Sequence, residues 1–107
     1  MASDIFLKFK EMARHHNRHS PSPKDWDALS AEFQHYLPVL YEQIMRSRLS
    51  TQEFQVCVLT YLNIDNTDIS VLVKTSSKTI SNARKKANRK LFGDDSASTL
   101  DENLLKF

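Results

Sequence analysis

The chain has 107 residues, of which 40% are hydrophobic and 26% charged, with one glycine and three prolines. These values are typical of a single folded domain rather than of a disordered chain, and they favour long helices over a turn-rich sheet. Cys57 has no second cysteine to pair with, which excludes a disulfide framework and favours a cytoplasmic location. No apolar run is long enough to span a membrane and the first residues lack a signal-peptide pattern, so we expect no membrane contact.

The chain before residue 22 predicts one amphipathic helix and a loop. The helix should be capped by Ser3 and end near His15, because apolar residues recur at three- and four-residue spacing: Ile5, Phe6, Phe9 and Met12. A polar stretch with two prolines follows. It should lead to a second helix that begins after Ser22, with Pro23 at its first position.

The apolar stripe of this second helix continues to residue 44 but is interrupted by Pro38. Proline removes a backbone donor and disfavours helix at the preceding residue, so two helices should meet near residues 36–38. Trp26, Phe33 and Tyr36 share helical spacing, which favours a structural role for Trp26 in the core over an aromatic ligand box.

A central, buried helix is predicted after Ser50. Ser50 and Glu53 form a capping-box signature, and the residues that follow are apolar on nearly all sides of a helix. A polar turn at 63–65 should then lead to a short helix, capped by Asp65 or Asn66, whose apolar residues are Ile69, Leu72 and Val73.

The next helix, residues 77–91, concentrates positive charge. Between residues 74 and 92 there are seven Lys or Arg and no Asp or Glu, which leaves eight basic and thirteen acidic residues elsewhere. Small and apolar residues share one arc of this helix, namely Ile80, Ala83, Ala87 and Leu91. A cationic face lies opposite, with Lys78, Asn82, Lys85 and Arg89. One or two cations would complement the helix dipole, but six on one helix repel one another and indicate a polyanionic partner.

Two further predictions concern side chains that hold the last part of the chain in place. Arg84 falls beside the apolar arc of helix 77–91, so we predict a structural role for it in an ion pair with Glu53. After the loop that follows Gly93, Ser98 and Asp101 form a second capping-box signature. It should open a short helix with the apolar residues Leu100, Leu104, Leu105 and Phe107.

A buried helix, a short helix and a basic helix joined by short turns are typical of a helix-turn-helix unit. Residues 49–91, LSTQEFQVCVLTYLNIDNTDISVLVKTSSKTISNARKKANRKL, also resemble the LuxR/GerE-type helix-turn-helix domain. The residues on its characteristic positions are Leu49, Glu53, Val56, Leu59, Asn66, Ile69, Val73, Ser76, Lys78, Thr79, Ile80, Arg84, Arg89, Lys90 and Leu91. The resemblance implies a winged-helix-like superfamily without an obvious wing and a recognition helix at 77–91. The DNA-binding residues expected from charge, face and resemblance are Lys78, Thr79, Ser81, Asn82, Lys85, Lys86, Arg89 and Lys90.

The whole chain has the order DIFLKF, DWDAL, a Tyr/Leu-Pro segment and a helix-turn-helix that ends in KLFG. In this order it resembles the C-terminal effector domain of bacterial tetratricopeptide-repeat sensor-regulators. It implies a sensor region of tetratricopeptide repeats upstream, so that Met1 would begin a fragment.

We therefore expect one all-α domain, 1–107: a helical bundle with packing and dimerisation helices (1–48), a helix-turn-helix (49–93) and a C-terminal helix (94–107). The expected function is that of a DNA-binding effector domain of a bacterial transcription regulator, which binds double-stranded DNA as a homodimer. One alternative is a protein-interaction or oligomerisation module on a helix-turn-helix scaffold, and another is a module like region 4 of a σ factor.

Catalysis has little support in the sequence. There is no glycine-rich phosphate loop and no Cys-His or Ser-His arrangement with a supporting acid, so we expect no enzyme, no catalytic residue and no cofactor. His15, His16 and His19 include a pair at helical spacing but have no further ligand close by. We interpret them as surface loop residues rather than as a metal site.

Overall fold

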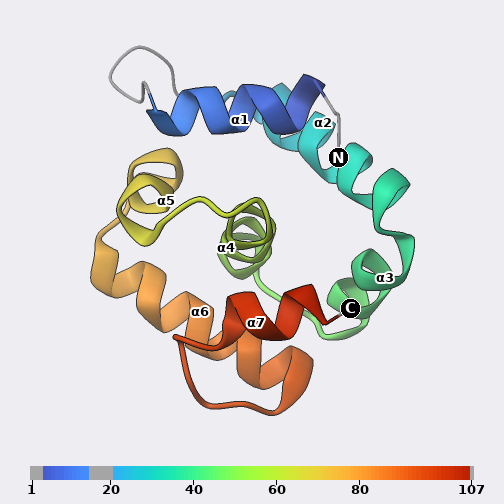
Figure 1. Cartoon of the computed structure of the whole chain (residues 1–107), viewed down its shortest axis with the longest axis vertical. Helices are drawn as coiled ribbons and strands as arrows, with labels where there is room; N and C mark the ends of the chain where they lie inside the picture. The colour runs from blue at the N-terminus through green and yellow to red at the C-terminus, as the bar shows by residue number, and fades with distance from the viewer. Residues whose placement is uncertain (1–3, 15–20, 107) are drawn as a thin grey trace.

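Seven α-helices make up the regular structure of residues 4–14 and 21–106, the part of the chain that the computed structural model describes. No strand occurs in this part, which confirms the all-α fold class. The helices, labelled in Figure 1, are α1 (Asp4–Arg14), α2 (Pro23–Tyr36), α3 (Pro38–Arg46), α4 (Thr51–Tyr61), α5 (Asn66–Val73), α6 (Ser77–Phe92) and α7 (Leu100–Leu105).

Helix α4 runs through the middle of the molecule and is seen nearly end-on in Figure 1, with the other helices around it. It begins with the predicted capping box: the Ser50 hydroxyl accepts from the Glu53 N–H at 3.1 Å, and the Ser50 N–H donates to the Glu53 carboxylate at 3.0 Å. The next two turns include four consecutive, fully buried side chains, those of Val56, Cys57, Val58 and Leu59. Helices α5, α6 and α7 all pack against α4, so its apolar residues find partners on every side.

The three N-terminal helices cover another part of the core. Helix α1 packs against α2 and α5, and an ion pair of 2.7 Å between Lys8 and Asp25 joins α1 to α2. Trp26 is partly buried against the core, with its ring centroid 4.9 Å from that of Phe9. Helix α2 gives way to α3 at Pro38, which confirms the break predicted from the proline.

Tight turns join α4 to α5 and α5 to α6. Each begins with a residue in the left-handed conformation, Asn63 (φ 64°) and Lys74 (φ 61°). In each turn the N–H of the following residue donates to the carbonyl five residues before it, at 3.1 Å after α4 and 2.9 Å after α5. This pattern of bonds closes a helix with few residues. Only residues 74–76 separate α5 from α6, and Ser76 caps α6 by accepting from the Thr79 N–H at 3.1 Å.

The predicted capping box of the last helix is wrong. Helix α7 begins after Thr99, whose φ of −101° and ψ of 2° are not those of a capping residue, and it has no side-chain cap. The hydroxyls here have other partners: Ser98 bonds to Ser96 at 2.9 Å, and Thr99 donates to Asp94 at 2.6 Å. Helix α7 is held instead by two fully buried leucines, Leu100 and Leu104, which lie on the side that packs on α4 and α6.

Several expectations lie outside the described residues. They are the cap at Ser3, the three histidines His15, His16 and His19, and the place of Phe107 in the last helix. Within the described ranges, no helix is long and apolar enough to cross a membrane.

Candidate nucleic-acid interface

Helix α6 is fixed to the body by one side only. The predicted arc of Ile80, Ala83, Ala87 and Leu91 is buried, and the helix packs on α4, α5 and α7. Two of these four residues are alanines, so the backbone of α6 can lie close to its neighbours. Because this side is closed, polar contacts with a partner must come from the opposite side.

That opposite side carries an exposed row of Lys78, Asn82, Lys85 and Arg89, which we call the α6 stripe. Spacings of four, three and four residues align these side chains along the helix axis. Lys86 is exposed beside the stripe, whereas Thr79 and Ser81 are half-buried at its edges. The Thr79 hydroxyl is also hydrogen-bonded to Ser76 at 2.9 Å. The structure therefore brings most of the predicted DNA-binding residues onto one surface.

Lys90 differs from the other predicted DNA contacts because it is turned back to the protein. Its ammonium lies 2.7 Å from the Glu53 carboxylate and 3.5 Å from the carbonyl of Arg48. The predicted pair of Glu53 with Arg84 is thus wrong: Lys90 takes that place. The reason is geometric, since Lys90 lies in the last turn of α6, beside the beginning of α4, where Glu53 is held by its cap.

Arg84 is mostly buried but has other partners, among them Asp101 at 4.0 Å. Its side chain is 11% exposed, and its guanidinium donates to the Ala97 carbonyl at 3.1 Å and to Asn66 at 3.0 Å. A weaker bond of 3.4 Å reaches Thr60. Arg84 therefore joins α4, the start of α5 and the loop before α7, and it does not belong to the exposed surface.

The surroundings of the Glu53 carboxylate favour its charged form. Burial raises the pKa of this group, but the hydrogen bonds from Lys90 and the Ser50 N–H, together with the charges of Lys90 and Lys86, outweigh burial and leave the pKa below its usual value. The ionised carboxylate in turn forms an ion pair with the Lys90 ammonium. Lys90 is therefore already neutralised inside the protein.

Arg89, at the end of the α6 stripe, has an acidic neighbour as well. Its guanidinium lies 3.2 Å from Asp95 in the loop before α7, and both side chains are largely exposed. An exposed pair of this kind is worth no more than about 1 kcal/mol. A phosphate can therefore replace Asp95 at small cost, unlike Glu53 at Lys90.

A polar network behind α6 was not foreseen from the sequence. Asn88 is fully buried; its amide donates to the Ser96 carbonyl at 2.7 Å and to Thr99 at 3.0 Å, and its oxygen accepts from Asn103 at 2.9 Å. Asp94 accepts from Thr99 and Asn103, and these bonds, with the Ser96 N–H, lower its pKa. The network fixes the loop between α6 and α7. An asparagine near the apolar arc was its one signal in the sequence.

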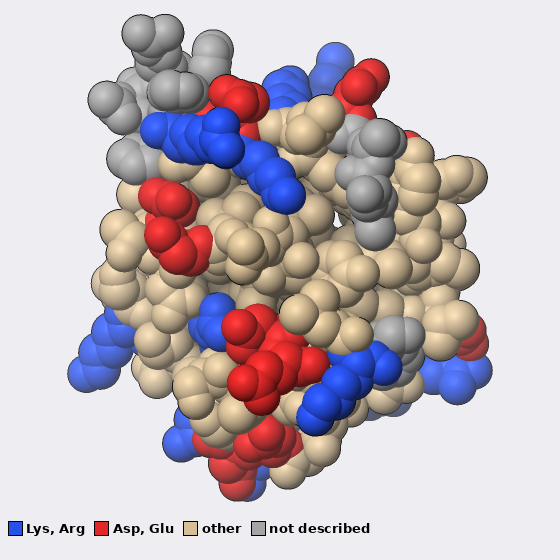
Figure 2. All heavy atoms as spheres, viewed as in Figure 1, with Lys and Arg blue, Asp and Glu red and all other residues tan. Residues whose placement is uncertain are grey.

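Most acidic side chains visible in Figure 2 lie on elements other than α6, although Asp95 reaches the end of the α6 stripe. Figure 2 shows them over α7 and its preceding loop and over the beginning of α5; the exposed ones on α7 are Asp101 and Glu102. The basic and acidic residues that the sequence places in different segments thus lie largely on different elements of the surface, and they meet at Arg89 and Asp95. A polyanion would be attracted to one part of this molecule and repelled by another.

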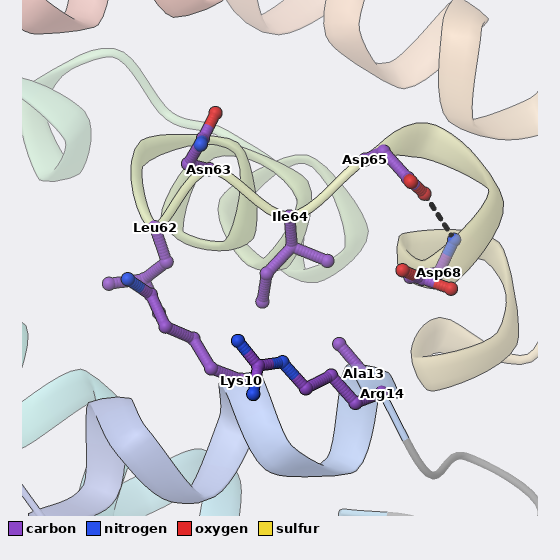
Figure 3. Close-up of a pocket in the computed structure, with 8 residues that line it drawn as sticks. All are labelled: Lys10, Ala13, Arg14, Leu62, Asn63, Ile64, Asp65 and Asp68. Carbon is purple, nitrogen blue, oxygen red and sulfur yellow. Dashed lines mark hydrogen bonds between the residues drawn. The ribbon is translucent and has the colours of Figure 1, made fainter.

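The hollow drawn in Figure 3 is another place where charged residues meet. It has a volume of about 290 Å³ and lies between α1 and the turn from α4 to α5. Lys10 and Arg14 lie on the α1 side, and Asp65 and Asp68 lie opposite. No nucleophile paired with a base lines it, and no group of three or more His, Cys, Asp or Glu suited to a metal occurs among the described residues.

No protein-family model, no curated protein and no solved structure matches this chain.

Proposed function

We propose that this chain binds duplex DNA through helix α6, with α4, α5 and α6 acting as a helix-turn-helix unit. The observation that carries the proposal is the α6 stripe: a row of cations and one amide on a helix whose opposite side is closed against the core. A helix with this division of faces can enter a groove without exposing apolar surface.

The dimensions of α6 support this assignment. Its 16 residues extend over about 24 Å. The helix is roughly 10–12 Å across with its side chains, and the major groove of B-DNA is about 12 Å wide. The three-residue connection to α5 is as short as the turns of known helix-turn-helix units.

The side chains of the α6 stripe suit both parts of DNA recognition. Lys78 and Lys85 can neutralise phosphates, which provides affinity without sequence preference. The Asn82 amide can donate to and accept from an adenine edge, and Arg89 can reach a guanine or a phosphate. Thr79 and Ser81 offer hydroxyls at the edges of the surface, while Lys90 contributes to stability rather than to binding.

We further propose that the chain is the DNA-binding part of a bacterial transcription regulator and that it acts as a homodimer. The resemblance of residues 49–91 to LuxR/GerE-type domains supports the first statement. The second follows from the usual two-fold arrangement of half-sites. A tetratricopeptide-repeat sensor region upstream of the present residues is the corresponding expectation for the complete regulator.

The salt dependence of binding tests the proposal. The affinity for a fluorescent duplex of random sequence is measured by anisotropy between 50 and 200 mM salt in wild type and in Lys85→Ala. Each phosphate contact contributes a slope of about −0.9 to log affinity against log salt, so Lys85→Ala should make the slope less steep by about 0.9 for each bound copy of the chain. Lys24→Ala, an exposed lysine on α2, is the matched control and should leave the slope unchanged. Salt-independent binding, or none, would remove the proposal.

An acidic protein partner is the second candidate, and the Arg89–Asp95 pair favours it, because it shows that the α6 stripe can hold a carboxylate. The two functions differ in one measurement. Binding to duplex DNA that Lys78→Ala and Lys85→Ala leave unchanged would favour the protein partner.

A further inference from the structure

Three residues other than glycine have a positive φ in the described part of the chain: Arg48 (55°), Asn63 (64°) and Lys74 (61°). This conformation costs a residue with a side chain about 1–2 kcal/mol relative to its usual region, and glycine and asparagine tolerate it best. Asn63 needs no special explanation. Arg48 and Lys74 are costlier choices, and both are cations.

These two cations lie at the two ends of α6. Lys74 begins the turn that leads into its first residue. Arg48 lies in the turn between α3 and α4, and its carbonyl accepts from Lys90 at 3.5 Å, which places this turn beside the last turns of α6. Residues 26 positions apart in the sequence therefore stand at opposite ends of one helix.

Neither side chain has a role in holding the fold together. Both are exposed, and neither forms an ion pair within the described residues, whereas Lys90 and Arg89 are paired with Glu53 and Asp95. The unpaired cations around α6 thus include Arg48 and Lys74, which are not themselves part of this helix.

We propose that Arg48 and Lys74 bind DNA phosphates at the two ends of the α6 site and fix the register of the helix on the duplex. This proposal rests on the proposed function and adds its backbone contacts. Strained positions occupied by costly residues are often functional, and phosphate contacts are what sets the orientation of a protein on DNA. The Arg48 guanidinium can bind a phosphate through two parallel hydrogen bonds.

The turns are suited to this task because they are short and internally bonded. The Lys74 N–H donates to Val71 at 3.2 Å, and the Arg48 N–H donates to Met45 at 3.4 Å. Each cation therefore leaves the protein from a fixed backbone position close to α6, unlike a cation on a long loop.

The test uses Arg48→Asn and Lys74→Asn, because asparagine tolerates a positive φ and removes the charge. Binding of a random-sequence duplex is measured as above, and thermal unfolding verifies the fold. For each bound copy of the chain, each variant should make the salt slope about 0.9 less steep, and the double variant about 1.8. Arg46→Asn is the matched control, because Arg46 is two residues from Arg48 but is paired with Glu42 at 2.6 Å; its slope should stay that of wild type.

The possible outcomes separate the two proposals. An unchanged slope in either Asn variant, with a less steep slope in Lys85→Ala, overturns the contacts at the ends of α6 and leaves DNA binding by α6 intact. Absence of duplex binding by the wild-type chain overturns the proposed function and this inference with it.

Discussion

The carboxylate of Glu53 is buried where α4, the end of α6 and the turn around Arg48 meet. Its pKa lies below the ordinary value despite burial, because Lys90 and the Ser50 N–H bind the charged form. A group with a lowered pKa contributes stability above its unfolded pKa of about 4.3, and the contribution is lost as the pH falls through the folded pKa. We therefore predict that Glu53→Gln lowers the free energy of unfolding at pH 7 by about 1.5–3 kcal/mol, because it weakens hydrogen bonds to a charged group, and that the difference from wild type shrinks below pH 4.

Urea unfolding of both proteins at pH 7 and pH 3.5 measures this difference. Glu42→Gln is the control, since its exposed pair with Arg46 should contribute less than about 0.5 kcal/mol at either pH. A difference that stays constant between the two pH values would show that the charge of Glu53 is not what stabilises the fold.

Cys57 illustrates how burial removes reactivity from a side chain. The thiol is fully buried in α4, and burial together with the charge of Glu53 raises its pKa to about 12. We predict that a thiol reagent labels native Cys57 at least roughly a hundred times more slowly than the unfolded chain, because labelling requires opening of the core. Rapid labelling of the native protein at pH 8, followed by absorbance, would contradict this placement.

At the level of elements, one side of α6 packs against the protein and the other faces outward. Its two asparagines lie on different sides. Asn88 is buried and holds the loop before α7, whereas Asn82 is exposed in the α6 stripe. We predict that Asn88→Ala lowers the free energy of unfolding by about 2–3 kcal/mol, because it leaves buried polar groups unpaired. Asn82→Ala, the matched control, should change it by less than about 0.5 kcal/mol.

Hydrogen exchange locates the effect of these two variants. Amides of α7 should exchange faster in Asn88→Ala than in wild type, since α7 follows the loop that Asn88 fixes. If the amides of α7 keep their protection while the rest of the protein loses stability evenly, the network does not anchor this helix.

Elements that follow from local rules were predictable, and those set by distant partners were not. The buried arc of α6 and the capping box at Ser50 depend on spacing within one helix. The partners of Lys90, Arg84 and Asn88 come from other elements, such as the start of α4 and the loop before α7. The cap expected at Ser98 had the right spacing but does not form, and the neighbouring Thr99 hydroxyl donates to Asp94 instead. The sequence was therefore sufficient to predict which face of α6 is exposed and basic. It was not sufficient to predict which cations are paired within the protein, because their partners come from other elements.

At the level of the whole molecule, the expected homodimer needs an apolar surface outside the α6 stripe. Leu7 of α1 and Leu105 of α7 are 54% and 71% exposed, and both line one hollow together with Phe6 and Tyr61. Two helices far apart in the sequence thus present exposed leucines at one place. In a two-fold dimer the patch of one copy packs against the same patch of the other, so each exposed leucine is buried in both copies.

We predict that Leu105→Ser weakens self-association at least roughly tenfold, because a leucine buried at an interface contributes about 1.5–3 kcal/mol. Val39→Ser is the matched control: Val39 is 67% exposed on α3 and does not line this hollow. Sedimentation velocity over a range of concentrations measures the dissociation constant, and the duplex-binding slope of each variant is compared with it. Loss of the dimer should also make the salt slope less steep, since one copy brings half of the phosphate contacts. A wild-type chain that stays monomeric at all concentrations, or a Val39→Ser variant that dissociates as readily as Leu105→Ser, would exclude this surface as the interface.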